Sequence, residues 1–394
     1  MQLATIGFGN AGGKIVDRLL EYERNRGRNL CRFAGAFNTA QIDLQKLEYI
    51  PEEYRVLYGQ TDERAKGHGV GADPDIGAEV TRRDLGEIER VLDGIPLHDI
   101  DAFLVVAGLG GGTGSGGAPV VAGELAEMYD EPVYGLGILP SKDEGGRAAL
   151  NAGRSLRSFT EATDGLLVFD NDAWREGGDS VAAGYERTNH EIAKRFASLL
   201  SAGVESGEHI SENAMDASDI KRTLGAGGVS TVAYAETDLD PQTRRKRGLL
   251  DRLRSSNVEE KKDGADPATK VYGVVRQAVR SRLTCPALIN STERALVVVS
   301  GPPEEFSRKG LERSREWLES EIGSAEVLAG DDPRPDATVL SATVLLANVT
   351  DVPRIEHLQE QAVSAQDNIE EQAAKREREI EELVTDSEDK LDPI

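Results

Sequence analysis

The most informative segment of this 394-residue chain reads Gly110-Gly111-Gly112-Thr113-Gly114-Ser115-Gly116. It follows the apolar run Ala102–Ala107, which predicts a strand, and it precedes Gly117–Met128, which predicts a helix. A phosphate chain needs several converging backbone N–H groups with no Cβ atoms in the way, and the positive end of a helix adds to the attraction. A linker would not be placed between a buried strand and a helix. We therefore predict a phosphate-binding turn, with the two hydroxyls available to phosphate or a metal.

A second glycine turn, GFGNAGGK at 7–14, follows the predicted strand Gln2–Ile6. Its glycines satisfy the dinucleotide pattern GxGxxG, but Asn38 and Thr39 stand where an acidic ribose ligand is expected. The P-loop pattern also fails, because Phe8 replaces its first glycine and Ile15 replaces the magnesium-binding Ser or Thr. The turn is therefore a phosphate loop of neither common type.

Short apolar runs alternate with amphipathic stretches over residues 2–204, which indicates right-handed βαβ units. The predicted fold class is α/β, with a Rossmann-like, mostly parallel sheet. In such sheets ligands bind beyond the carboxyl ends of the strands, where both glycine turns fall. The predicted strands are Gln2–Ile6, Phe33–Phe37, Ala102–Ala107, Pro132–Leu139 and Leu166–Phe169, and the predicted helices between them include Lys14–Tyr22, Gly117–Met128 and Gly146–Phe159.

A long central helix, about Ser180–Ala202, joins this first domain (1–204) to the rest of the chain. After a connecting segment at 205–224, residues 225–352 mix strands and helices and predict a smaller α+β domain. Residues 353–394 form an acidic tail. The apolar spacing from Ile355 to Ile369 predicts a helix packed on the body that loosens toward Lys375, before a disordered end, DSEDKLDPI. The heptads are too short to predict a coiled coil.

The composition excludes several classes of protein. The formal charge is −24, from 70 acidic and 46 basic residues, which disfavours binding to nucleic acid or anionic membranes. Such a surface suits concentrated salt and favours a halophilic source; the alternative is an ordinary acidic protein whose charge is raised by its tail. Cys31 and Cys285 are far apart, and no ligand spacing predicts a metal site made by the protein alone. No signal peptide or spanning helix is evident, so we predict a cytoplasmic protein.

GGGTGSG at 110–116 resembles the signature of the tubulin/FtsZ superfamily, in which two glycine loops hold GTP. The likeness continues through residues 67–77, which are similar to the FtsZ loop that covers the terminal phosphate. Tyr185 and Asn189, four apart on one helix face, resemble the tubulin pair at guanine. The residues that the resemblance places around GTP or GDP are Gly9, Asn10, Ala11, Gly12, Gly13, Lys14, Gly71, Ala72, Asp73, Gly110, Gly111, Gly112, Thr113, Gly114, Ser115, Glu144, Asn171, Tyr185 and Asn189.

The resemblance also implies that hydrolysis needs a second subunit. Mg²⁺ would be held mainly by phosphates and water, with K⁺ as a further candidate cation. Asp216 and Asp219 resemble the acidic residues that FtsZ inserts into the pocket of the next subunit, so we assign Asp219 to polarise water and Asp216 to support it. Without a second subunit, the pair would simply be favourable charges at a helix start.

Three positions depart from the FtsZ pattern. Ala214, preceded by Asn213, stands where FtsZ has Asn; Ala40 replaces an aspartate; and Arg147 lies three residues after Glu144 rather than four. These departures predict slower or differently tuned hydrolysis, with the nucleotide site retained.

FtsZ-like loops, a tubulin-like Tyr185/Asn189 helix and an acidic surface together resemble the archaeal CetZ family. That resemblance implies longitudinal self-assembly and control of cell shape. The alternatives are a division-ring protein of the FtsZ type, a non-polymerising GTP-binding regulator, and a dinucleotide-dependent oxidoreductase using the glycines of the first turn. The basic run at 244–247 is interpreted as a solvated loop or a contact between subunits, with no nucleic-acid partner.

Overall fold

The computed structural model describes residues 1–175, 181–202, 215–239, 266–323 and 326–388. Two sequence interpretations lie outside these residues, namely the basic run at 244–247 and the departure at Asn213 and Ala214. Within the described chain, one ten-stranded sheet runs through the molecule in the order β3-β2-β1-β4-β5-β6-β7-β10-β8-β9. The strands are β1 (Leu3–Phe8), β2 (Cys31–Asn38), β3 (Arg55–Leu57), β4 (Ala102–Gly108), β5 (Val133–Leu139), β6 (Gly165–Asp170), β7 (Val229–Asp238), β8 (Thr292–Gly301), β9 (Glu326–Pro333) and β10 (Val339–Val349).

The sheet has a parallel part and a mixed part. Strands β1 to β6 pair only in parallel, as the βαβ alternation predicts, whereas β10 pairs antiparallel with both β7 and β8. The two parts meet where Leu166 and Leu167 of β6 pair with Val229 and Ser230 of β7. The predicted α/β class with a mostly parallel sheet is therefore confirmed, and the mixed part continues the same sheet.

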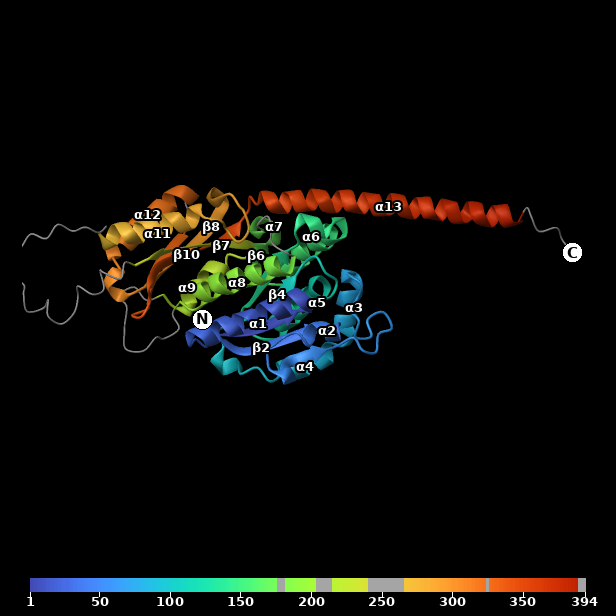
Figure 1. The fold of residues 1–394 in the computed structure, drawn as a ribbon, viewed down its shortest axis with the longest axis horizontal. Coiled ribbons are helices and arrows are strands. Elements are labelled where there is room, and N and C mark those ends of the chain that lie inside the picture. Colours follow the sequence, from blue (N-terminus) through green and yellow to red (C-terminus); the bar gives the residue numbers. More distant parts are fainter. Residues whose placement is uncertain (176–180, 203–214, 240–265, 324–325, 389–394) are drawn as a thin grey trace, which may run out of the picture.

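Helices cover both faces of the sheet (Figure 1). They are α1 (Gly9–Arg26), α2 (Gln41–Leu44), α3 (Pro74–Arg83), α4 (Leu85–Leu92), α5 (Thr113–Met128), α6 (Gly146–Glu161), α7 (Asn171–Trp174), α8 (Val181–Leu200), α9 (Ala217–Leu224), α11 (Pro267–Arg280), α12 (Arg308–Ile322) and α13 (Pro353–Glu388). None of these helices, over the described residues, is both long and apolar enough to cross a membrane.

Strand β4 shows how the two cores form. Its side chains alternate, so that Phe103 and Val105 join one buried cluster while Leu104 and Val106 join the other. The first cluster includes apolar residues of α3, α5 and α6, and the second includes those of α1 and the central helix α8. Burial on both faces explains why the parallel strands read as continuous apolar runs.

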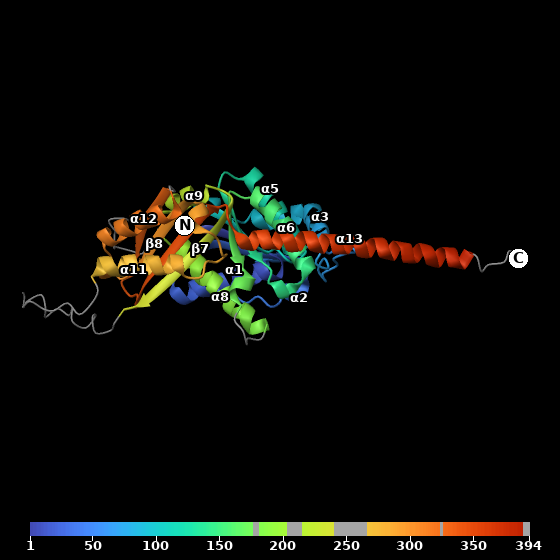
Figure 2. The same ribbon diagram turned by 90° about the horizontal axis from the view of Figure 1, so that it is seen from above.

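The C-terminal helix α13 differs from the sequence prediction. It packs along α6 and continues as one helix past the body of the protein, in both views of the molecule (Figures 1 and 2). Leu358 and Ala362 are buried, as the apolar spacing predicts. From Asp367 to Glu381 every residue is exposed, so the helix leaves the body before Lys375, but it remains helical beyond that point. Glu, Gln, Ala, Lys and Arg favour helix without tertiary contacts, and pairs such as Lys375–Glu379 add to this. The first residues of the predicted disordered end are helical to Glu388, and 389–394 lie outside the description.

Candidate nucleotide site

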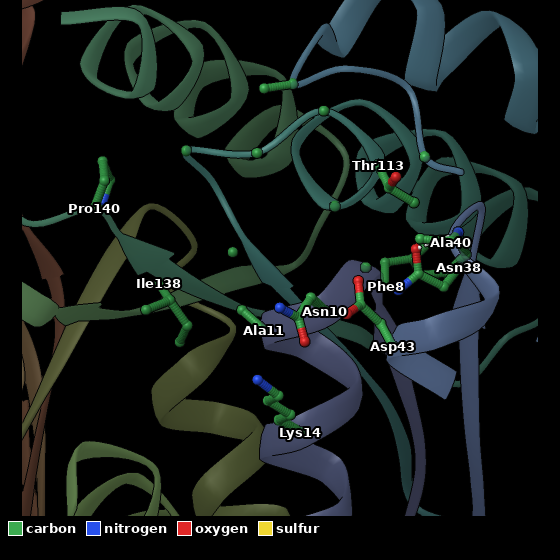
Figure 3. Close-up of a pocket in the computed structure, with 18 of the residues that line it drawn as sticks. Phe8, Asn10, Ala11, Lys14, Asn38, Ala40, Asp43, Thr113, Ile138 and Pro140 are labelled. Atoms are coloured by element: carbon green, nitrogen blue, oxygen red, sulfur yellow. Dashed lines mark hydrogen bonds between the residues drawn. The ribbon is translucent and has the colours of Figure 1, made fainter. Parts of the chain in front are cut away.

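A cavity of about 540 Å³ opens at the carboxyl ends of β1, β4 and β5 (Figure 3). The two glycine turns form its floor, the loop at 68–72 closes one side, and α7 and α8 contribute the remaining wall. Most of the predicted nucleotide residues line it, namely Gly9, Asn10, Ala11, Lys14, Gly71, Ala72, Gly110, Gly111, Gly112, Thr113, Gly114, Glu144, Asn171, Tyr185 and Asn189. Segments separated by more than a hundred residues thus meet in one place, as the sheet topology requires.

Four predicted residues do not line the cavity, and two of them are glycines of α1. A Cβ at Gly12 would overlap the carbonyl oxygen of Val106 on β4, and one at Gly13 would lie 3.5 Å from Leu47 Cδ1. Gly12 therefore lets α1 pack closely against the sheet, whereas a Cβ at Gly13 would make an ordinary contact. The close packing at Gly12 places Gly9, Asn10 and Ala11 at the cavity without Gly12 or Gly13 facing it.

The other two are polar residues with partners inside the protein. Ser115 Oγ donates to the carbonyl oxygen of Gly111, so the hydroxyl stabilises the turn from within. Asp73 caps α3, where its Oδ1 accepts hydrogen bonds from the backbone N–H groups of Asp75 at 3.0 Å and Ile76 at 3.1 Å. Both side chains therefore stabilise backbone that borders the cavity without facing it themselves.

Three polar residues that the sequence interpretation did not assign also line the cavity: Asn38, Asp43 and His68. Asn38 ends β2, and Asp43 lies on α2 one turn beyond Ala40, which lines the cavity too. Asn10 on α1 and Asp43 on α2 both line this part of the cavity (Figure 3). The signal available in the sequence was the spacing of Asp43 three residues after the missing aspartate.

The opposite side of the cavity is built around Glu144 and Tyr185. Glu144 ends a short 3₁₀ turn, Lys142–Glu144, and its Oε1 accepts a hydrogen bond from the backbone N–H of Ser141 at 2.8 Å. Tyr185 Oη donates to the same carboxylate oxygen at 3.3 Å. Burial and the neighbouring Glu144 raise the pKa of Tyr185, so the phenol stays protonated and remains a donor. Tyr185 is 40% exposed and lines the cavity, so it is accessible to a ligand there.

A buried ion pair fixes this side of the cavity to the C-terminal helix. Arg354, near the start of α13, donates from Nε to Asp170 Oδ1 at 2.9 Å and from Nη2 to the Pro140 carbonyl oxygen at 2.8 Å. Asp170 also caps α7, whose first residue is Asn171. Burial raises the pKa of Asp170, although Arg354 opposes the shift. The positions of Pro140 and Asn171 therefore depend on α13.

Asp216 and Asp219 lie away from the cavity of their own chain. They form a capping box at the start of α9, in which Asp216 Oδ1 accepts from Asp219 N at 3.1 Å and Asp219 Oδ2 accepts from Asp216 N at 3.1 Å. Lys221 of the same helix lies 3.8 Å from Asp101, just before β4, whereas the cavity lies beyond the other end of that strand. Asp216 is exposed and Asp219 is half-buried.

Arg147 and the candidate metal ligands complete the set of residues singled out in the sequence. Arg147 does not line the cavity, and its Nη2 lies 3.9 Å from Asp73 Oδ2. Over the described residues, no group of three or more His, Cys, Asp or Glu side chains is arranged to hold a metal ion.

The parallel sheet, the double glycine turn and the helix-bordered cavity define a protein of the tubulin/FtsZ class. In agreement, the GTPase domain of the Tubulin/FtsZ family matches residues 2–179, and the C-terminal domain of tubulin-like CetZ proteins matches residues 178–364. The tubulin-like protein CetZ1 of Haloferax volcanii is 51% identical over 371 residues, which are 94% of this chain and 93% of CetZ1. The chain belongs to the tubulin-like CetZ family, as its sequence motifs predicted.

Solved structures give the same result. The GDP-bound monomer of CetZ1 from Haloferax volcanii has a TM-score of 0.81 at 48% identity, covering 93% of this chain and 100% of that one. The GTPγS-bound protofilament of CetZ2 from the same organism also has a TM-score of 0.81, at 39% identity, covering 94% and 100%. The fold prediction is thus confirmed by relatives as well as by the sheet topology.

Proposed function

We propose that this protein binds and hydrolyses GTP, assembles head-to-tail into cytoplasmic filaments and helps to control cell shape. The observation that carries the proposal is the separation of two complementary parts: a cavity at one end of the sheet and the Asp216/Asp219 pair toward the other. The GTPγS-bound protofilament of CetZ2 supports assembly of this kind. Family membership argues against the dinucleotide-dependent oxidoreductase.

Different parts of the cavity would bind different parts of the nucleotide. Backbone N–H groups of the two glycine turns would hold the phosphates, Glu144 would accept from the ribose, and Tyr185 would stack on guanine while Asn171 and Asn189 pair with its edge. The carboxylate of Asp43 would repel a triphosphate unless a cation lay between them. Asp43 and Asn10 are oxygen donors of the kind Mg²⁺ accepts beside phosphates, and the bound ion would neutralise phosphate charge.

Hydrolysis would begin when a second subunit docks over the cavity. Its Asp219 would orient and polarise the attacking water, and its Asp216 would hold Asp219 in place through the capping box. Because the two aspartates lie away from their own cavity, an isolated subunit would bind GTP but hydrolyse it slowly. Whether a subunit holds GTP or GDP would then depend on whether it has been assembled into a filament.

The test is GTP hydrolysis per subunit, measured against protein concentration in high potassium chloride. We expect activity to rise cooperatively in the unaltered protein, and Asp219→Ala to lower it about 100-fold or more while GTP affinity is retained. Asp367→Ala, which removes an exposed carboxylate on α13, serves as the matched control.

Each alternative predicts a different result in the same experiment. Specific activity that does not change with concentration would favour a non-polymerising regulator. Absence of GTP binding would contradict the proposal altogether. A division role would be distinguished in cells, where loss of the protein would block septation rather than change shape.

A further inference from the structure

One face of α6 is directed at the loop that borders the phosphate side of the cavity. Arg147, Asn151 and Arg154 are spaced four and three residues apart, so they project from the same side of the helix. Each has a partner within residues 72–75. Arg147 Nη2 lies 3.9 Å from Asp73 Oδ2, Asn151 Nδ2 lies 2.9 Å from the Ala72 carbonyl oxygen, and Arg154 Nη1 lies 3.9 Å from Asp75 Oδ2.

The central residue of the three makes the strongest contact. Asn151 is 4% exposed, whereas the arginine side chains on either side are 62% and 54% exposed. Long, solvent-exposed ion pairs contribute little, while a buried amide that loses its partners does not recover them from water. Asn151 Nδ2 also donates to the Gly110 carbonyl oxygen at 3.0 Å. One buried side chain thus joins the loop at 71–73 to the glycine turn at 110–112.

The loop that Asn151 holds is in a conformation that needs support. Ala72 has a φ of 57°, in the left-handed region that residues with a Cβ rarely occupy. Such a backbone persists only where its surroundings fix it. The loop also rests directly on the glycine turn, because a Cβ at Gly112 would come within 2.6 Å of both Asp73 N and Val70 Cγ2. Gly71 and Ala72 line the cavity from this braced position.

We propose that Asn151 is a positioning residue that holds the 71–73 loop closed over the phosphate side of the cavity, and so favours a nucleoside triphosphate over a diphosphate. This inference rests on the proposed function. Asn151 does not line the cavity, so it acts through Ala72 and Gly110 without touching the nucleotide. The base and sugar are assigned to Tyr185, Asn189, Asn171 and Glu144, so the loop and the 110–112 turn that it touches would act on the phosphate chain, which is where a triphosphate and a diphosphate differ.

The variants that test this are Asn151→Asp, which keeps the shape but cannot donate, and Asn151→Ser, which is shorter. Arg157→Ala is the matched control on the same helix, because Arg157 is exposed and, among the residues that the structure describes, its ion pair is with Glu161 of α6, at 3.0 Å. The affinities of the full-length protein for GTPγS and GDP are measured by titration calorimetry below the assembly concentration. We expect GTPγS to bind about tenfold more weakly to both Asn151 variants, as loss of a buried hydrogen bond implies, with GDP affinity changed less than about twofold.

A second measurement separates positioning from general instability. Hydrogen exchange of amides at 67–77 should become faster in both Asn151 variants, while amides of β4 and β5 exchange at the unaltered rate. Equal weakening of GTPγS and GDP, or no weakening of either, would overturn the inference while leaving the proposed function standing. Failure of the unaltered protein to bind either nucleotide would instead overturn the proposed function, and this inference with it.

Discussion

The two ends of the sheet are built in different ways. At the cavity end, close glycine contacts, the buried amide of Asn151 and the Asp170–Arg354 pair fix the backbone before any ligand arrives. Toward the other end, Asp216 and Asp219 lie at the start of α9, where Asp216 is exposed and both carboxylates accept hydrogen bonds from backbone N–H groups of the helix start. Under the proposed function, a single chain would suffice to bind the nucleotide, whereas hydrolysis would require two chains in contact.

The largest effect is expected where the cavity end is attached to α13. Arg354→Met leaves Asp170 buried without its cation and should lower the free energy of unfolding by about 3–5 kcal/mol, the usual cost of breaking a buried ion pair from one side. Chemical denaturation measures it. Combining Arg354→Met with Asp170→Asn should recover part of the loss, because the amide oxygen can still cap α7. A loss of less than about 1 kcal/mol, the usual value for an exposed ion pair, would contradict the role of the Asp170–Arg354 pair in holding α13 to the cavity.

A smaller loss is expected where α1 packs on the sheet. Gly12→Ala forces a Cβ into the Val106 carbonyl oxygen and should cost about 1–3 kcal/mol in unfolding free energy, with weaker GTP binding as α1 shifts. Gly123→Ala on α5 is the control, because its Cβ would meet nothing within 4 Å and should leave the protein unchanged or slightly more stable. Equal thermal stability of the two variants would contradict the close-packing role of Gly12.

The smallest effect on stability is expected toward the opposite end. Asp216→Ala removes the cap of α9 and should lower unfolding free energy by about 1 kcal/mol, while Asp216→Asn keeps an oxygen acceptor and should cost only a few tenths. Asp216→Ala should lower assembly-dependent hydrolysis more than Asp216→Asn does, because only the alanine variant loses the acceptor that holds Asp219 in the capping box. Full hydrolysis by Asp216→Ala would contradict the supporting role of Asp216.

Much of the fold could be predicted from periodicity and glycine turns. The parallel strands emerged because burial on both faces makes them continuously apolar, but β3 is only three residues long and gives no such signal. At the site, Tyr185 and Asn189 were predictable from their resemblance to the tubulin pair, with a spacing that places both on one helix face. Asn151 was not, because its role depends on two carbonyl groups from distant segments, Ala72 and Gly110, and a lone Asn within a helix carries no pattern.

The central claim is that each subunit holds half of an active site, and a mixing experiment tests it most directly. Gly111→Asp places a carboxylate beside the phosphates at a position with open space for a side chain, which disables the cavity, while Asp219→Ala disables the opposite end. Each variant alone should be inactive in GTP hydrolysis. An equal mixture should regain roughly a quarter of the unaltered activity, because about one head-to-tail junction in four then joins an intact cavity to an intact aspartate pair. A mixture that co-sediments as filaments yet remains as inactive as its components would contradict the account.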